Sequence, residues 1–123
     1  MIEELIGRVF TARNVAHIEH FTTNSYSRHE ALGEFYEGVI PELDKLVECW
    51  QGQFGGLSAV EMPDPPKGED FDIVAYLRDE SDWIEANREE IAGDSPAIGN
   101  LVDNVSSVFT RTLFKLERLR WRL

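Results

Sequence analysis

Apolar residues recur every three to four positions through most of this chain, in four separate amphipathic segments. The segments cover residues 1–22, 28–51, 70–92 and 96–122. This recurrence is typical of a helix that buries one face, whereas a half-buried strand alternates at every second position, and no such alternation continues for long. The pattern therefore predicts an all-α protein with four helices of roughly equal length.

Local signals mark where these helices begin and bend. Ser27 and Glu30 form a capping box, which predicts the start of the second helix. Pro41 lies inside that helix and predicts a kink, because its ring clashes with the carbonyl group one turn earlier. Ser95 as N-cap, followed by Pro96 at the first helical position, predicts the start of the fourth helix.

A long connection, residues 52–69, joins the second and third helices and is rich in glycine and proline. About 17 extended residues can span roughly 55 Å, which is more than the length of such a bundle. We therefore expect a single domain over residues 1–123: a ferritin-like four-helix bundle in which the third helix starts at the end opposite to where the second stops. The connection either serves only as this crossover or binds a partner as well.

Composition is that of a globular protein, with 42% hydrophobic and 28% charged residues. No stretch approaches the roughly 20 apolar residues that a membrane helix needs, and the N-terminus has no signal-peptide pattern. The single cysteine, Cys49, cannot form an internal disulfide. We therefore expect a cytoplasmic protein, in the host cytoplasm if it is viral.

The net charge of -11 is distributed unevenly. Residues 111–123 hold five basic side chains against Glu117 alone, which gives about +4, so the first 110 residues carry about -15. The acidic excess disfavours nucleic-acid binding, because phosphate contacts need lysine and arginine. Basic residues near a helix C-terminus also suit the helix dipole. The alternatives are a nucleic-acid contact at the basic end and a protein partner for the acidic surface.

Histidines and carboxylates carry the candidate chemistry. His17, His20 and His29 fall within thirteen consecutive residues, and Asp44 and Glu48 follow at a spacing of four. Imidazole plus carboxylate is the ligand set of iron, manganese or zinc. On one helix His29 and Asp44 lie roughly 22 Å apart, at about 1.5 Å per residue, so one metal ion cannot touch both within a single chain.

Two copies paired antiparallel would bring His20 and His29 of one copy beside Asp44 and Glu48 of the other. We expect these four residues to be the metal ligands, in a homodimer or larger homo-oligomer formed through the first two helices. His17 is better explained as a surface or core histidine. The alternative for the histidines is a capping or interface role without metal, and the alternative for the carboxylates is a solvated helix face.

One stretch resembles the Dps family of ferritin-like proteins; it reads His20-Phe21 … Ser27-Arg28-His29-Glu30 … Asp44 … Glu48. In that family an aspartate and a glutamate follow the second histidine by 15 and 19 residues, and the offsets from His29 match both. The resemblance implies a ferroxidase centre across a twofold subunit interface, where iron would be oxidised by peroxide or oxygen. Small uncharacterised phage-encoded proteins with a similar stretch also resemble this segment.

Gly33 departs from the Dps pattern, because that family has a carboxylate one turn after the second histidine. Two hypotheses follow. The first is a Dps-like protein that binds iron, or manganese or zinc, at an intersubunit site of His20, His29, Asp44 and Glu48, with ferroxidase activity left undecided by the missing carboxylate. The second is a non-enzymatic ferritin-like scaffold or protein-interaction module, encoded by a phage, that has lost the metal site.

Overall fold

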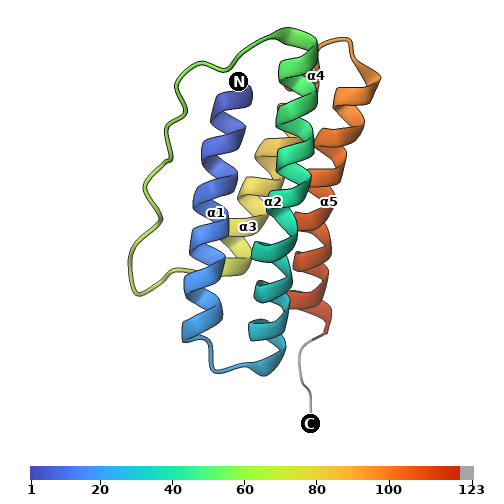
Figure 1. The fold of residues 1–123 in the computed structure, drawn as a ribbon. Coiled ribbons are helices and arrows are strands. Elements are labelled where there is room, and N and C mark those ends of the chain that lie inside the picture. Colours follow the sequence, from blue (N-terminus) through green and yellow to red (C-terminus); the bar gives the residue numbers. More distant parts are fainter. Residues whose placement is uncertain (120–123) are drawn as a thin grey trace.

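The computed structural model describes residues 1–119, and all regular structure in that range is helical (Figure 1). The helices are α1 (Ile2–Thr22), α2 (Tyr26–Phe54), α3 (Ile73–Ala86), α4 (Arg88–Ala92) and α5 (Pro96–Arg118). The prediction of an all-α protein is therefore confirmed. None of the described helices is both long and apolar enough to cross a membrane.

The four longer helices lie side by side (Figure 1). α1 packs against α2 and α3, and α5 packs against α2, α3 and the short α4. Residues 55–72, which we call the strap, leave the end of the molecule where α2 stops and where α1 begins. The strap then runs along α1 and enters α3 nearer the other end (Figure 1). The long connection is thus a crossover that lies against a helix.

The predicted third helix, residues 70–92, is broken in two at Asn87. The Asn87 side-chain amide donates to the backbone carbonyl of Trp83 at 2.8 Å, so it satisfies a helix-end acceptor locally. After the break, the indole N–H of Trp50 donates to the carbonyl of Ile91 at 3.2 Å, which ties α4 to α2. The prediction of four continuous helices is therefore wrong at this position.

Local sequence signals predicted the N-cap of one helix correctly and that of another incorrectly. Ser95 is the N-cap of α5, with Pro96 in the first turn, as predicted. The capping box at Ser27 is wrong: Ser25 is the N-cap of α2, and its hydroxyl accepts from the backbone N–H of Arg28 at 3.2 Å. Two serines two residues apart offer nearly equal caps, and the turn geometry selects the first.

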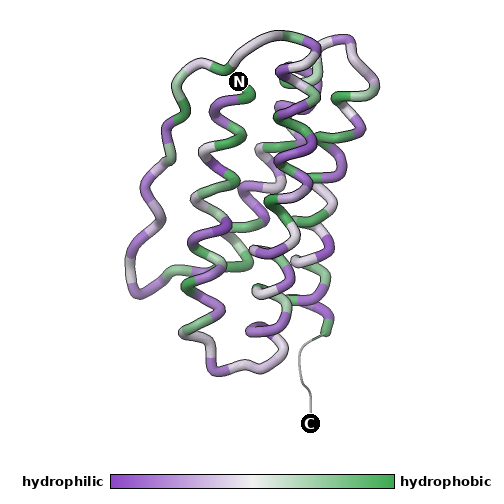
Figure 2. Tube along the Cα trace, in the orientation of Figure 1, coloured by the Kyte–Doolittle hydropathy of each residue, from purple (hydrophilic) through white to green (hydrophobic). Residues whose placement is uncertain are grey.

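α2 is longer than predicted and includes Pro41 without ending there. It ends at Phe54 and is followed by Gly55 with φ of 107°, a conformation that favours glycine. Inside the bundle, Phe35 of α2 and Phe109 of α5 are fully buried and meet edge to face, with ring centroids 4.9 Å apart. Hydrophobic and hydrophilic residues alternate along each helix in Figure 2, as expected of helices with one buried face.

Candidate functional site

His20 and His29 hold the α1–α2 turn together through a reciprocal pair of hydrogen bonds. The Nδ1 of His20 lies 2.7 Å from the carbonyl oxygen of His29, and the Nδ1 of His29 lies 2.8 Å from the carbonyl oxygen of His20. Because a carbonyl oxygen only accepts, both Nδ1 atoms donate, and in the neutral rings both Nε2 atoms carry a free lone pair. The rings stack, with centroids 3.7 Å apart. We call this arrangement the histidine clasp.

Gly33 packs directly against the histidine clasp. A Cβ atom placed on Gly33 would lie 3.2 Å from the Cε1 and 3.3 Å from the Nδ1 of His20. A side chain at this position would press on that ring, which would have to shift by a few tenths of an ångström. Beside it, His17 stacks on Tyr36 with ring centroids 3.9 Å apart. His17 therefore has a packing role, and Gly33 has a steric one.

The structure brings only two of the four predicted metal ligands together. Asp44 and Glu48 lie further along α2, and both are exposed. Within residues 1–119, no group of three or more histidine, cysteine, aspartate and glutamate side chains is arranged to hold a metal ion. A site shared between two copies would take its ligands from both chains, so the assignment of His20, His29, Asp44 and Glu48 stays a prediction.

Three apolar side chains are exposed where α1 turns into α2. Ile18, Phe21 and Tyr26 are 59%, 71% and 77% exposed. Ile18 follows the three-to-four-residue apolar spacing of residues 1–22, which predicts burial, so the structure corrects the sequence pattern at this position. The Phe21 ring lies beside His20 and the Tyr26 ring beside His29, with centroids 5.8 and 6.5 Å apart, so the histidine clasp supports both aromatic side chains. We call the three exposed side chains the turn patch.

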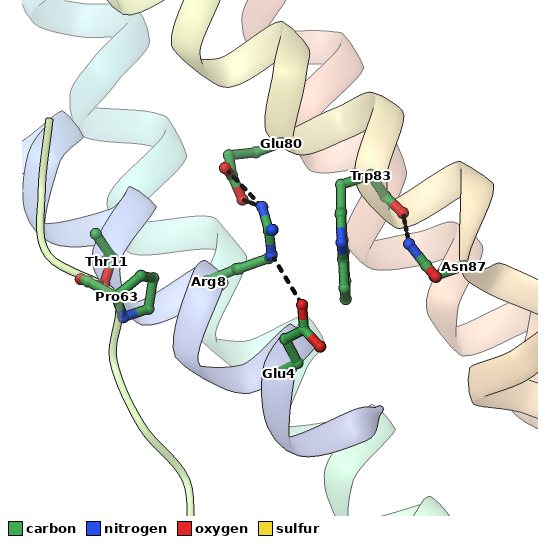
Figure 3. Close-up of polar contacts among 7 residues, drawn as sticks. All are labelled: Glu4, Arg8, Thr11, Pro63, Glu80, Trp83 and Asn87. Carbon is green, nitrogen blue, oxygen red and sulfur yellow. Dashed lines mark hydrogen bonds and ion pairs between the residues drawn. The ribbon is translucent and has the colours of Figure 1, made fainter.

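A second cluster, which sequence reasoning missed, surrounds Arg8 on α1. Figure 3 shows its guanidinium between Glu80 of α3 and Glu4 of its own helix. Its Nη1 lies 3.1 and 3.2 Å from the two carboxylate oxygens of Glu80, and its Nε lies 3.7 Å from Glu4. The guanidinium carbon also lies 4.5 Å from the ring centroid of Trp83, a cation–π contact. Glu4 and Arg8 lie on α1, whereas Glu80 and Trp83 lie on α3, more than 70 positions further along the chain, so no local signal identifies the set.

The strap is fixed to one stripe of α1, at positions spaced by four. The Glu3 carboxylate accepts from the backbone N–H of Ser58 at 3.0 Å. A Cβ atom on Gly7 would lie only 2.0 Å from the carbonyl oxygen of Glu61, so the strap backbone rests on the helix there. The hydroxyl of Thr11 donates to the carbonyl of the next anchored residue, Pro63, at 2.8 Å (Figure 3).

Between the strap, α1 and α3 lies an open cleft of about 510 Å³, which we call the acidic cleft. Its charged lining residues are five carboxylates and one guanidinium: Glu3, Glu4, Glu61, Asp64, Glu80 and Arg8. Burial raises the pKa of Glu80, although Arg8 opposes the shift. Burial also raises the pKa of the lining Tyr76 phenol, and the negative charge of Glu80 adds to the shift. The backbone N–H of Ser58 lowers the pKa of Glu3.

The C-terminal part of α5 carries a basic surface. Lys115 pairs with Glu34 of α2, and Glu117 pairs with Arg78 of α3. The remaining side chains of this surface are exposed; they are Arg111, Phe114, Arg118 and Leu119, and we call them the basic stripe. Arg120 and Arg122, which also contribute to the predicted basic end, lie outside the described residues.

Comparisons with known proteins give a family but no activity. A family model described as "Family of unknown function (DUF5856)" matches residues 20–116. The chain is also similar to an uncharacterized 14.6 kDa protein in the mobD-ri intergenic region of Enterobacteria phage T4. The two are 27% identical over 117 residues, which is 93% of this chain and 86% of the phage protein. No solved structure matches.

These matches correct the assignment to Dps, because neither is to a Dps or ferritin protein. The structure gives a physical reason why the motif misled. The two histidines bind each other's main chain, and the ring of His20 lies tightly against the position of Gly33, where Dps has a carboxylate. Asp44 and Glu48 are spaced by one helical turn, which is common on any solvated helix face. The resemblance to phage-encoded proteins is the part that the comparisons support.

Proposed function

The chain belongs to the family of unknown function DUF5856, and on that premise we propose that it is a non-enzymatic protein-interaction module that self-associates through the turn patch. The observation that carries this proposal is the exposure of Ile18, Phe21 and Tyr26, at 59–77% each, on a turn fixed by hydrogen bonds. An ordered cluster of exposed aromatic side chains is typical of a binding surface. The similarity to a protein of phage T4 supports a role in the cytoplasm of an infected bacterium.

The partner that we propose is a second copy of the chain, packed antiparallel along α1 and α2. In that arrangement the exposed carboxylates of Asp44 and Glu48 in one copy face the imidazoles of His20 and His29 in the other. We propose that each copy is a four-helix bundle with a long crossover, in which α3 and α4 together take the place of one helix. The packing of α1 against α2 and α3, and of α5 against α2, α3 and α4, supports this frame.

The test compares the mass of the native protein in solution with that of a Phe21→Ser/Tyr26→Ser variant. At about 10 μM the parent is expected to form a dimer or larger oligomer and the variant to be a monomer, so that weaker contacts, which need concentrations near 1 mM, do not contribute. Phe54→Ser is the matched control, since Phe54 is also exposed, at 47%, but lies at the other end of α2. A parent that is monomeric, or a variant that keeps the parent's mass, would contradict the proposal.

A metal ion between the copies is the second candidate, and the histidine clasp is the observation that favours it. With both Nδ1 atoms donating to backbone carbonyls, a neutral ring offers only an Nε2 lone pair, so a carboxylate of a second copy can face it only across a proton or a cation. A divalent cation such as iron, manganese or zinc would satisfy both groups, and a backbone carbonyl on Nδ1 is a frequent support for a histidine ligand. The ligands would be His20, His29, Asp44 and Glu48.

Metal analysis of protein purified without a histidine tag tests this candidate. A shared site predicts a stoichiometric divalent metal in the oligomer, lost on Asp44→Asn although that variant leaves the histidine clasp intact. Lys45→Gln is the control, since Lys45 is an exposed neighbour without ligand chemistry. If the protein is metal-free and still self-associates, the metal candidate is wrong and the proposal of an interaction module stands.

A further inference from the structure

We propose that the basic stripe of one copy docks into the acidic cleft of a second copy, so that copies associate head to tail. This contact uses surfaces other than the turn patch. It is carried by charge complementarity between two described regions and by exposed apolar side chains on both of them.

The arginines of the basic stripe are available for a partner, whereas the charged side chains beside them make ion pairs within their own chain. Lys115 and Glu117 make ion pairs with α2 and α3 of their own chain. Among residues 1–119, Arg111 and Arg118 make no ion pair, and both are exposed. Phe114, three residues after Arg111, is 54% exposed. A helix surface with two arginines around an exposed phenylalanine has the composition of an interface anchor.

The acidic cleft offers the complementary chemistry. Its carboxylates outnumber its cations by five to one, and three of them, on Glu4, Glu61 and Asp64, belong to exposed residues. Met62 of the strap is 53% exposed at the same place and supplies an apolar contact for a phenylalanine. Arg8 already shows how this cleft receives a guanidinium, which is held by carboxylates and lies over an indole ring.

The donor must be a second copy. α5 packs against α2, α3 and α4, whereas the cleft lies between α1, α3 and the strap (Figure 1). The stripe is formed by a continuous helix and its C-cap, and cannot move to the cleft of its own chain. Copies of net charge -11 repel at long range, but this repulsion is screened beyond about 8 Å at physiological salt, while contact pairs persist. Because the two surfaces differ, the contact can repeat along a row of copies.

Two complementary variants test the contact, both built on the Phe21→Ser/Tyr26→Ser background so that the turn patch cannot contribute. The first, Arg111→Glu/Arg118→Glu, removes the donor surface and keeps the cleft. The second, Glu61→Lys/Asp64→Lys, removes the acceptor surface and keeps the stripe. Asp82→Lys/Glu85→Lys is the control for the second, since it makes the same charge change at exposed α3 positions outside the cleft.

Sedimentation at concentrations up to about 1 mM gives the readout. The background protein is expected to associate, more weakly at high salt, and each reversal alone to weaken this association by about tenfold or more. An equimolar mixture of the two reversals pairs an intact stripe with an intact cleft and a reversed stripe with a reversed cleft, so it is expected to regain the association that each variant alone has lost. A monomeric background protein, a mixture that stays monomeric, or a loss caused equally by the control would overturn the proposal. If the turn patch alone proves not to mediate self-association, the proposed head-to-tail contact is unaffected.

Discussion

At the scale of single residues, the histidine clasp ties the end of α1 to the start of α2 through two main-chain acceptors. The closeness of His20 and His29 was predictable, because a short turn between two antiparallel helices must bring their ends together. The bonds that they make were not, since each ring binds the main chain of the other and any residue has a carbonyl group. The motif therefore suggested a metal site, whereas within the single chain the two histidines make a structural contact. Gly33 was interpreted as the position of a lost ligand, whereas in the structure the ring of His20 packs closely against it.

The first prediction concerns the clasp. His20→Ala and His29→Ala are each expected to lower the free energy of unfolding by about 1–3 kcal/mol, because each removes a part-buried hydrogen bond and the stacked ring. The double variant is expected to cost less than the sum of the two, since either change already opens the clasp. Urea unfolding measures this. His17→Ala removes a stacked ring without a hydrogen bond, and a cost as large as that of His20→Ala would contradict the assignment.

The second prediction concerns Glu80, whose pKa is raised above its ordinary 4.5 mainly by burial. Near and above that ordinary value the unfolded chain releases the proton while the folded protein still holds it, so stability falls as pH rises through the folded pKa. Glu80→Gln has no proton to release. From about pH 4 to about pH 7, the urea midpoint of the parent should therefore fall relative to that of Glu80→Gln. Parallel midpoints across this range would show that burial does not control this carboxyl group.

At the scale of elements, helices with a local start signal were predictable and contacts between distant segments were not. The start of α5 is determined by two adjacent residues, Ser95 and Pro96. Beyond the break at Asn87, α4 contacts α2 through Trp50, which lies 41 residues before its acceptor Ile91. The binding of the strap to α1 is equally non-local. Its sequence signal, a small residue at position 7 between Glu3 and Thr11, is too common to interpret alone.

The third prediction tests the strap contact with two glycines that lie inside helices. Gly7→Ala should lower the free energy of unfolding by about 1–3 kcal/mol, because its Cβ would collide with the Glu61 carbonyl and push the strap away. Gly38→Ala should raise it by up to about 1 kcal/mol, since nothing lies within 4 Å of its Cβ and alanine favours the helix. Chemical unfolding of both variants decides; two changes of the same sign would mean that the strap does not rest on α1.

At the scale of the whole molecule, the division into an α1–α2 hairpin and an α3–α5 half joined by one strap follows from apolar periodicity and connection length. The buried contact of α2 with α5, including Phe35 against Phe109, joins the halves independently of the strap. Surface function was not predictable to the same extent. The turn patch, the acidic cleft and the basic stripe each depend on which side chains the fold leaves exposed.

The fourth prediction follows from this division. A glutamate-specific protease should cut first after Glu61 or Glu69, because both lie in exposed strap residues outside the helices, whereas exposed Glu30 and Glu37 lie within α2. The two fragments should still elute together, since the helix contacts survive. Limited proteolysis followed by gel filtration and mass measurement tests this. Early cleavage within α2, or fragments that separate, would mean that the bundle depends on the intact strap.

The unequal attachment of the strap has a practical consequence. Among the described contacts, hydrogen bonds tie it to α1 only between Ser58 and Pro63, and no such bond holds residues 64–70. A fluorophore site or an epitope inserted between Lys67 and Gly68 would therefore leave the anchoring register undisturbed. The same insertion between Ala59 and Val60 would shift every anchor that follows it. The protein thus provides a natural position for labels with which its assembly can be followed inside cells.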